Sequence, residues 1–171
     1  MTSKQKLIEE LNKIGAINID DSKYDVLPFV DLKRVFTHPH VFGMIVEALL
    51  ETISPFEFDK IGGIEYSGLP WASIIAYRLN KGLFYLRRSE TERNALIGKI
   101  SPYEKIILVD DVLTTGSFTL KAVDTIKSYN VSLIGVFVIL DREEGGSEEL
   151  KKRGVKTYSL LKLSQLRFYK D

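Results

Sequence analysis

Two neighbouring aspartates followed by hydroxyl side chains and a glycine are the residues of this chain whose types and spacing best suit chemistry. They lie at positions 110–117, in the order Asp-Asp-Val-Leu-Thr-Thr-Gly-Ser, after an apolar stretch. Backbone amides at the start of a following helix would carry partial positive charge, hydroxyls would add donors, and Gly116 would allow a close backbone approach. Two carboxylates beside a phosphate would repel it unless they met ribose hydroxyls or Mg²⁺. The stretch therefore predicts a ribose-phosphate site.

A plain strand end that caps the next helix is the simpler interpretation of the same residues. A cap needs one polar residue, whereas five polar residues surround the glycine here, so we favour the phosphate site. A Walker P-loop is excluded because the stretch does not end in Gly-Lys-Ser/Thr, and the glycine pattern of dinucleotide-binding proteins is missing as well.

Residues 65–68 form a second candidate, with Gly63 before them and Gly68 at their end. They follow a short apolar stretch and precede a helical pattern, so their backbone amides could bind a diphosphate. A tight turn from strand to helix would need the same glycines for steric reasons alone, and both interpretations can hold together.

Arg142 follows a long apolar stretch and is the third candidate. A guanidinium at that place could bind a carboxylate through two parallel hydrogen bonds. The simpler alternative is an ion pair with a neighbouring acid, Asp141, Glu143 or Glu144. On the residues alone the two interpretations are equally good.

All three candidates follow segments that we expect to be strands of one parallel sheet. Apolar stretches at 61–64, 83–86, 105–110, 131–140 and 157–161 alternate with helical patterns at 3–14, 39–52, 70–79, 117–129 and 147–153. Strands that are apolar on both faces and alternate with helices indicate an α/β protein whose sheet is covered on both sides. Ligands of such sheets bind outside the carboxyl ends of the strands, which is where the candidates fall.

The amino-acid composition narrows the class of protein further. The 171 residues carry a formal net charge of +1, which argues against general binding to nucleic acid or an anionic membrane. There is no cysteine, so disulfides and thiolate metal sites are excluded, and no apolar run approaches the roughly 20 residues of a membrane span. We find no repeat or linker, and we expect one domain over residues 1–171 in the cytoplasm, with no nucleic-acid or membrane partner.

The stretch from Val109 to Ser117 resembles the phosphoribosyl pyrophosphate signature of type I phosphoribosyltransferases, and the chain is most similar to orotate phosphoribosyltransferase over most of its length. Residues 63–70 resemble the pyrophosphate loop of that family, and residues 84–88 the strand and basic pair that open its mobile loop. Residues 141–146 resemble the segment whose arginine contacts orotate, and residues 29–33 the hood strand that helps to cover the base.

The resemblance implies a type I phosphoribosyltransferase fold, with a central mostly parallel sheet flanked by helices and a small N-terminal hood in residues 1–36. It implies transfer of the phosphoribosyl group of phosphoribosyl pyrophosphate to orotate in pyrimidine biosynthesis. Mg²⁺ would arrive with the substrate diphosphate, without a dedicated protein metal site. A homodimer is implied because the mobile loop serves the partner's site.

The resemblance also assigns roles to individual residues. The catalytic candidates are Asp110, Asp111 and Arg93. The residues that would bind phosphoribosyl pyrophosphate are Glu65, Tyr66, Ser67, Gly68, Arg87, Arg88, Asp110, Asp111, Val112, Leu113, Thr114, Thr115, Gly116, Ser117 and Phe118. Those that would bind orotate are Lys23, Thr114 and Arg142.

Residues 87–98 depart from the family pattern. Orotate phosphoribosyltransferases usually place Lys-x-His-Gly after the basic pair, on a longer loop that stabilises the leaving diphosphate, and this chain has neither the lysine nor the histidine there. Arg93 is the candidate replacement, although arginine is bulkier and planar. Two alternatives therefore stay open: a non-catalytic paralogue that binds phosphoribosyl pyrophosphate or a nucleotide, and a phosphoribosyltransferase for another base.

Overall fold

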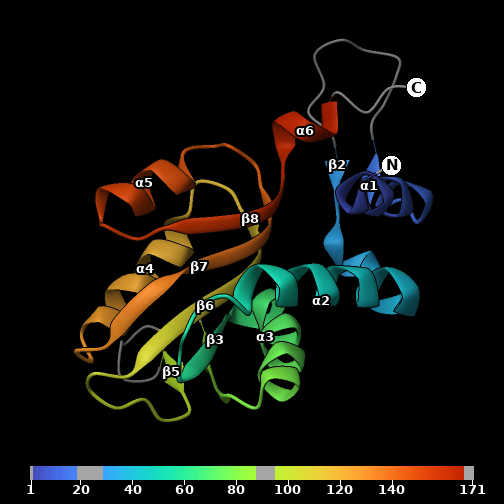
Figure 1. Cartoon of the computed structure of the whole chain (residues 1–171). Helices are drawn as coiled ribbons and strands as arrows, with labels where there is room; N and C mark the ends of the chain where they lie inside the picture. Colours follow the sequence, from blue (N-terminus) through green and yellow to red (C-terminus); the bar gives the residue numbers. More distant parts are fainter. Residues whose placement is uncertain (1, 19–28, 88–94, 168–171) are drawn as a thin grey trace.

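A computed structural model describes residues 2–18, 29–87 and 95–167, and its centre is a six-stranded sheet (Figure 1). The strands are β3 (Lys60–Ile64), β4 (Gly82–Leu86), β5 (Leu96–Ile97), β6 (Lys105–Leu113), β7 (Ser132–Asp141) and β8 (Thr157–Lys162). They lie in the order β5-β4-β3-β6-β7-β8, and every neighbouring pair is parallel except β4 and β5. The predicted mostly parallel α/β sheet is confirmed, although the short β5 was not predicted.

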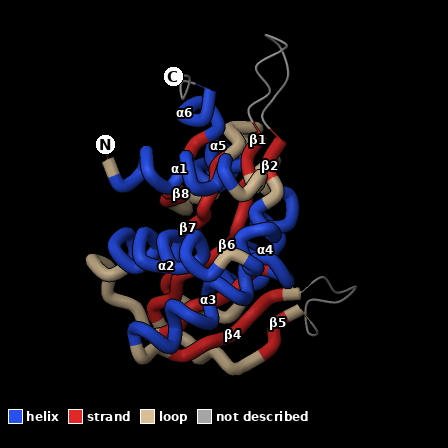
Figure 2. The backbone as a smooth tube through the Cα atoms, turned by 90° about the vertical axis from the view of Figure 1, so that its right-hand side faces the viewer, coloured by secondary structure: helices blue, strands red, loops and turns tan. Residues whose placement is uncertain are grey.

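Helices cover both faces of this sheet. They are α1 (Ser3–Lys13), the 3₁₀ helix η1 (Leu32–Thr37), α2 (Pro39–Ile53), α3 (Glu65–Leu79), α4 (Ser117–Lys127), α5 (Gly146–Lys152) and α6 (Leu163–Arg167). Side chains alternate between the faces of a strand, so Ile107 and Val109 of β6 share a buried cluster with α1, α2 and α3, whereas Ile106 and Leu108 share one with α4 and α5. In Figure 2, α2 and α3 cross in front of the strands. Within the described ranges, no helix has both the length and the apolar character needed to cross a membrane.

The N-terminal segment packs against the same core. α1 begins with a capping box formed by Thr2 and Gln5. The short antiparallel strands β1 (Ile17–Asn18) and β2 (Phe29–Val30) follow it. Buried side chains of α1 and η1 join the cluster of α2 and α3, so apolar contacts attach this segment to the core.

α3 begins at Glu65, whereas the sequence pattern predicted a turn over residues 65–68 and a helix from Pro70. Proline usually marks the first turn of a helix because it has no amide hydrogen to donate. Pro70 instead lies inside α3, where it removes one bond, to the carbonyl of Tyr66, near the exposed start of the helix. Residues 65–68 therefore form the first turn of α3, and the predicted helix boundary is wrong.

β6 also extends beyond its predicted end at Asp110. It continues to Leu113 because β7 pairs with it along this length, through Val112 opposite Leu140 and Leu113 opposite Asp141. The two aspartates of the signature are thus strand residues, and the connection to α4 consists only of residues 114–116.

Candidate active site

The direction in which successive strands are added to the sheet reverses between β3 and β6. From β3 the chain passes to β4 on one side, and it later returns to place β6 on the other side of β3. In open α/β sheets, ligands bind outside the carboxyl ends of the strands at such a point. α3 starts after β3 and residues 114–116 follow β6, so two of the predicted substrate segments meet there.

Asp110 lies at this point and is almost completely buried, with 7% of its surface exposed. Its Oδ1 accepts hydrogen bonds from the amide of Asp111 at 2.9 Å and from the hydroxyl of Ser67 at 3.3 Å. Burial raises the pKa of Asp110 well above its ordinary value, and the charge of Asp111 raises it further. Asp111 is half-buried and is therefore more accessible to a ligand than Asp110.

Gly68 explains how α3 comes so close to the two aspartates. A Cβ atom at that position would lie 2.4 Å from the carbonyl oxygen of Val109 and 3.2 Å from Cα of Asp110. Glu65, the first residue of α3, has a φ of 51°, a left-handed conformation that non-glycine residues adopt rarely. The sharp entry into α3 and the missing side chain of Gly68 together set Ser67 against Asp110.

The hydroxyl side chains between β6 and α4 are open to solvent. Thr114, Thr115 and Ser117 are all exposed. Gly116 has a φ of 75°, and its carbonyl accepts the amide of Leu120 at 2.7 Å in the first turn of α4. The hydroxyls and the N-terminal amides of α4 therefore lie at the same end of the helix, an arrangement that suits a phosphate.

Two backbone hydrogen bonds join this loop to the segment after β7. The amide of Arg142 donates to the carbonyl of Leu113 at 2.9 Å, and the amide of Gly146 donates to the carbonyl of Thr114 at 3.1 Å. A Cβ atom on Gly146 would lie 2.5 Å from that oxygen of Thr114. The sequence pattern did not single out Gly146, although the Gly145-Gly146 pair was a signal for a close backbone contact. The structure thus brings together the segments that carry Thr114 and Arg142.

Arg142 forms an ion pair with Glu144, with 2.7 Å between Nε and Oε1. Of the three acids that the sequence offered as partners, Glu144 therefore pairs with Arg142. Asp141 is buried and accepts bonds from the amide of Glu143 and the hydroxyl of Ser147, two roles that the sequence did not indicate. Contact between Arg142 and a ligand carboxylate stays a prediction.

The remaining predicted residues differ in how far they can reach a ligand. Arg87 is exposed at the end of β4, and Tyr66 projects from the first turn of α3 with 86% of its surface exposed. Val112 and Phe118 are half-buried and Leu113 is buried, so these three can offer a ligand mainly their backbone. Three predicted residues lie outside the described ranges: Lys23, Arg88 and Arg93.

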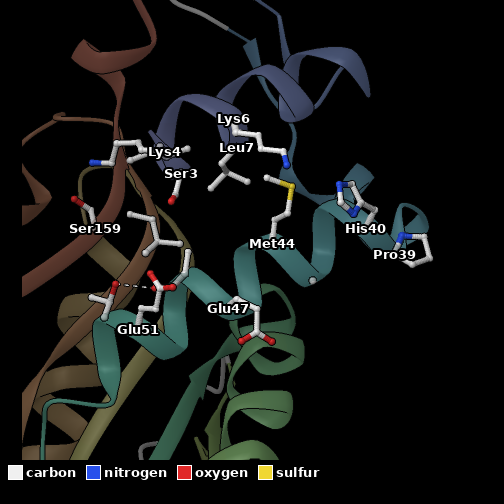
Figure 3. A pocket seen from close by; sticks show the side chains of 15 residues that line it. Ser3, Lys4, Lys6, Leu7, Pro39, His40, Met44, Glu47, Glu51 and Ser159 are labelled. Carbon is white, nitrogen blue, oxygen red and sulfur yellow. Dashed lines mark hydrogen bonds between the residues drawn. The ribbon is translucent and has the colours of Figure 1, made fainter. Parts of the chain in front are cut away.

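A groove of about 730 Å³ lies elsewhere, between α1, α2 and β8 (Figure 3). α1 contributes Lys4 and Lys6 to its walls, and α2 contributes Glu47 and Glu51. Of the described residues that were predicted to bind substrate, none lines it. The size of this groove therefore does not mark the active site.

A mostly parallel sheet whose switch point carries two aspartates, a hydroxyl-glycine loop and the start of α3 has the arrangement of a type I phosphoribosyltransferase. The family model of the phosphoribosyl transferase domain matches residues 33–160. The orotate phosphoribosyltransferase of Sulfolobus acidocaldarius is 35% identical over 168 residues, which cover 95% of this chain and 83% of that protein. This chain belongs to the phosphoribosyltransferase family and, within it, to the orotate phosphoribosyltransferases.

Solved structures share the fold. The orotate phosphoribosyltransferase of Aeropyrum pernix matches with a TM-score of 0.81 at 27% identity, covering 94% of this chain and 95% of that one. The UMP synthase of Leishmania donovani matches with a TM-score of 0.82 at 24% identity, and the chain spans 37% of its length. The predicted family and fold class are confirmed, and the similarity favours an orotate enzyme over the two alternatives that the sequence left open.

Proposed function

We propose that this protein transfers the 5-phosphoribosyl group from phosphoribosyl pyrophosphate to orotate, giving orotidine 5′-monophosphate and diphosphate. The observation that carries the proposal is the pair of backbone bonds between residues 113–114 and residues 142–146. These bonds set the two predicted orotate contacts, Thr114 and Arg142, beside the loop that would hold the ribose 5-phosphate. Similarity to orotate phosphoribosyltransferases supports orotate as the acceptor.

In the proposed reaction, the bond from the anomeric carbon to the diphosphate oxygen breaks, and a bond from that carbon to a ring nitrogen of orotate forms. The electron pair of the broken bond leaves with the diphosphate, and the acceptor nitrogen gives up its proton. Positive charge grows on the ribose in between, and prearranged charges and dipoles stabilise it. Asp110 and Asp111 would orient the ribose by accepting hydrogen bonds from its hydroxyls.

The ribose 5-phosphate would be held by the loop that follows these aspartates. Its exposed hydroxyls can donate to phosphate oxygens, and the first amides of α4 add partial positive charge. Gly116 would let the backbone approach the phosphate closely. The residues that we assign to this role are Val112, Leu113, Thr114, Thr115, Gly116, Ser117 and Phe118.

The diphosphate would lie between the first turn of α3 and the end of β4. These ends adjoin, because β3 and β4 are parallel neighbours with Ile64 opposite Leu86. Residues 65–68 would offer amides there, and Arg87 a cationic side chain. Arg88 and Arg93, which lie outside the described residues, would add the positive charge that a departing diphosphate requires.

Mg²⁺ would arrive bound to the diphosphate. Within the described ranges, no three His, Asp or Glu side chains come together as ligands of a metal ion. Mg²⁺ commonly keeps oxygen ligands from substrate phosphates and water and takes one or two carboxylates from the protein, which Asp111 could supply. The bound ion would withdraw charge from the leaving group.

The family resemblance extends the proposal to the assembly and its setting. We propose a homodimer, because the mobile loop of such enzymes serves the partner's site. We also propose that residues 1–171 form one domain, and that the protein works in pyrimidine biosynthesis in the cytoplasm. Analytical ultracentrifugation of the purified protein tests the dimer, since a monomer at assay concentration would contradict it.

The activity can be tested directly. Purified protein mixed with orotate, phosphoribosyl pyrophosphate and MgCl₂ should consume orotate, followed by its ultraviolet absorbance, and replacing MgCl₂ with EDTA should stop turnover. Binding of phosphoribosyl pyrophosphate in calorimetry, with no turnover at high enzyme concentration, would indicate the non-catalytic paralogue instead. Faster turnover of adenine, hypoxanthine or uracil would reject orotate as the acceptor.

A further inference from the structure

Arg142 is held by Glu144 along one edge of its guanidinium group. Nε of Arg142 donates to Oε1 of Glu144 at 2.7 Å, and the two side chains are 24% and 34% exposed. A guanidinium has five N–H donors in one plane, and its two terminal nitrogens form a second edge that matches a carboxylate. Among the described residues, Glu144 accepts a hydrogen bond from this guanidinium group, and that bond comes from Nε.

The loop that carries this pair is anchored on both sides. Asp141, 4% exposed, accepts the amide of Glu143 at 2.8 Å and the hydroxyl of Ser147. One carboxylate oxygen of Glu143 accepts the amide of Ser164 at 2.7 Å, at the start of α6. The other two acids of the loop thus have donors of their own.

We propose that Glu144 is a positioning residue that presents the terminal nitrogens of Arg142 to the carboxylate of the acceptor substrate. The inference rests on the proposed function, since it takes orotate, a planar acid, as the acceptor. The amide of Arg142 is already fixed to the carbonyl of Leu113, and the bond to Glu144 restrains the far end of the side chain. A long side chain that is ordered before binding loses less conformational entropy when the ligand arrives.

The direction of the effect separates positioning from simple competition. If Glu144 only competed with the substrate carboxylate, its removal would free a cation and tighten orotate binding. If Glu144 positions Arg142, its removal lets the guanidinium move and weakens orotate binding. A restraint that acts equally on the bound substrate and the transition state changes KM rather than kcat.

Steady-state kinetics of Glu144→Ala should therefore show a KM for orotate raised roughly tenfold, with kcat and the KM for phosphoribosyl pyrophosphate changed by less than about twofold. Glu144→Gln should recover part of the loss, because its amide oxygen still accepts the Nε–H bond. Glu149→Ala is the matched control. Glu149 pairs with Lys152 on the surface of α5 at 2.6 Å, and its variant should behave as the unaltered protein.

Each other outcome has a definite meaning. An unchanged or lowered KM for orotate in Glu144→Ala would overturn the inference and leave the proposed function intact. No orotate turnover by the unaltered protein would refute the proposed function, and the inference with it. An equal rise in the KM of both substrates would also refute positioning, because a general disturbance of the site affects both.

Discussion

The hydroxyl of Ser67 donates a hydrogen bond to Oδ1 of Asp110, 3.3 Å away, although 43 positions separate the two residues in the chain. Ser67 belongs to the first turn of α3, where we expect the diphosphate, and Asp110 belongs to β6, where we expect the ribose. The bond therefore links the two halves of the proposed phosphoribosyl pyrophosphate site. It also lowers the pKa of Asp110, against the larger opposing effect of burial.

Ser67→Ala should weaken this link. Loss of one neutral hydrogen bond, worth about 0.5–1.5 kcal/mol, should lower kcat/KM for phosphoribosyl pyrophosphate by roughly three- to tenfold. It should also raise the pKa of Asp110 further, which a pH–rate profile can detect. Ser73→Ala is the control, because the hydroxyl of Ser73 donates to the carbonyl of Leu69 within α3. Equal losses in both variants would argue against a specific role for Ser67.

Asp110→Asn should increase stability at neutral pH while it impairs catalysis. Burial raises the pKa of Asp110 above its ordinary value near 3.8, so the folded protein keeps a proton that the unfolded chain has already lost. Stability from this group is therefore fully present below the ordinary pKa and falls as the pH rises toward the raised one. Asparagine cannot ionise, and its side-chain oxygen can still accept the bonds from Ser67 and Asp111.

Melting temperatures measured between pH 4 and pH 8 test this relationship. The advantage of Asp110→Asn over the unaltered protein should grow as the pH rises. A difference that stays constant over the whole range would show that ionisation of Asp110 is not the cause.

Gly68→Ala should push α3 away from β6. The new Cβ atom would meet the backbone of Val109 at 2.4 Å, and backbone cannot swing aside as a side chain can. We expect a loss of about 1–3 kcal/mol in the free energy of unfolding and weaker binding of phosphoribosyl pyrophosphate, measured by denaturant titration and calorimetry. Gly43→Ala in α2 is the control. Apart from its chain neighbours and the adjoining backbone of α2, no heavy atom of the described residues lies within 4 Å of its Cβ position, and alanine favours a helix by up to ~1 kcal/mol. Equal stability of the two variants would contradict the close contact.

Arg142→Ala should raise the KM for orotate by roughly ten- to a hundredfold, because the proposed charge-assisted contact with the substrate carboxylate would be lost. The KM for phosphoribosyl pyrophosphate should change little. Arg142→Lys should restore only part of the affinity, since lysine cannot present two parallel donors. Arg153→Ala provides the comparison, as Arg153 pairs with Asp124 at 3.4 Å on the surface. If orotate kinetics respond alike in the Arg142 and Arg153 variants, Arg142 does not contact orotate.

Much of the fold could be predicted, and the candidate phosphate loop could be proposed, because their signals are contiguous in the chain. β6 is buried on both faces, so its apolar pattern indicated a central strand, and residues 110–117 follow one another without a break. The type and order of these residues suggest chemistry before any tertiary contact is known. The family resemblance depends on such contiguous stretches, and the comparisons confirm it.

The boundary of α3 could not be predicted in the same way. The local preference of proline for the first turn of a helix predicted a start at Pro70. In the structure α3 begins at Glu65, and Gly68 packs directly on β6. The sequence also left three acids as equal partners for Arg142, and the folded loop pairs it with Glu144.

The sequence by itself determined the class of the fold and the family, and it singled out residues 110–117 as the candidate phosphate loop. Only the tertiary structure decided that Ser67 meets Asp110, that Gly146 lies against Thr114, and that Glu144 holds Arg142. The reason is physical. The pattern of apolar and polar residues along one segment reflects the burial and the backbone preference of that segment alone. The geometry of a site depends on distances between segments, and these distances are set only when the helices and strands pack together.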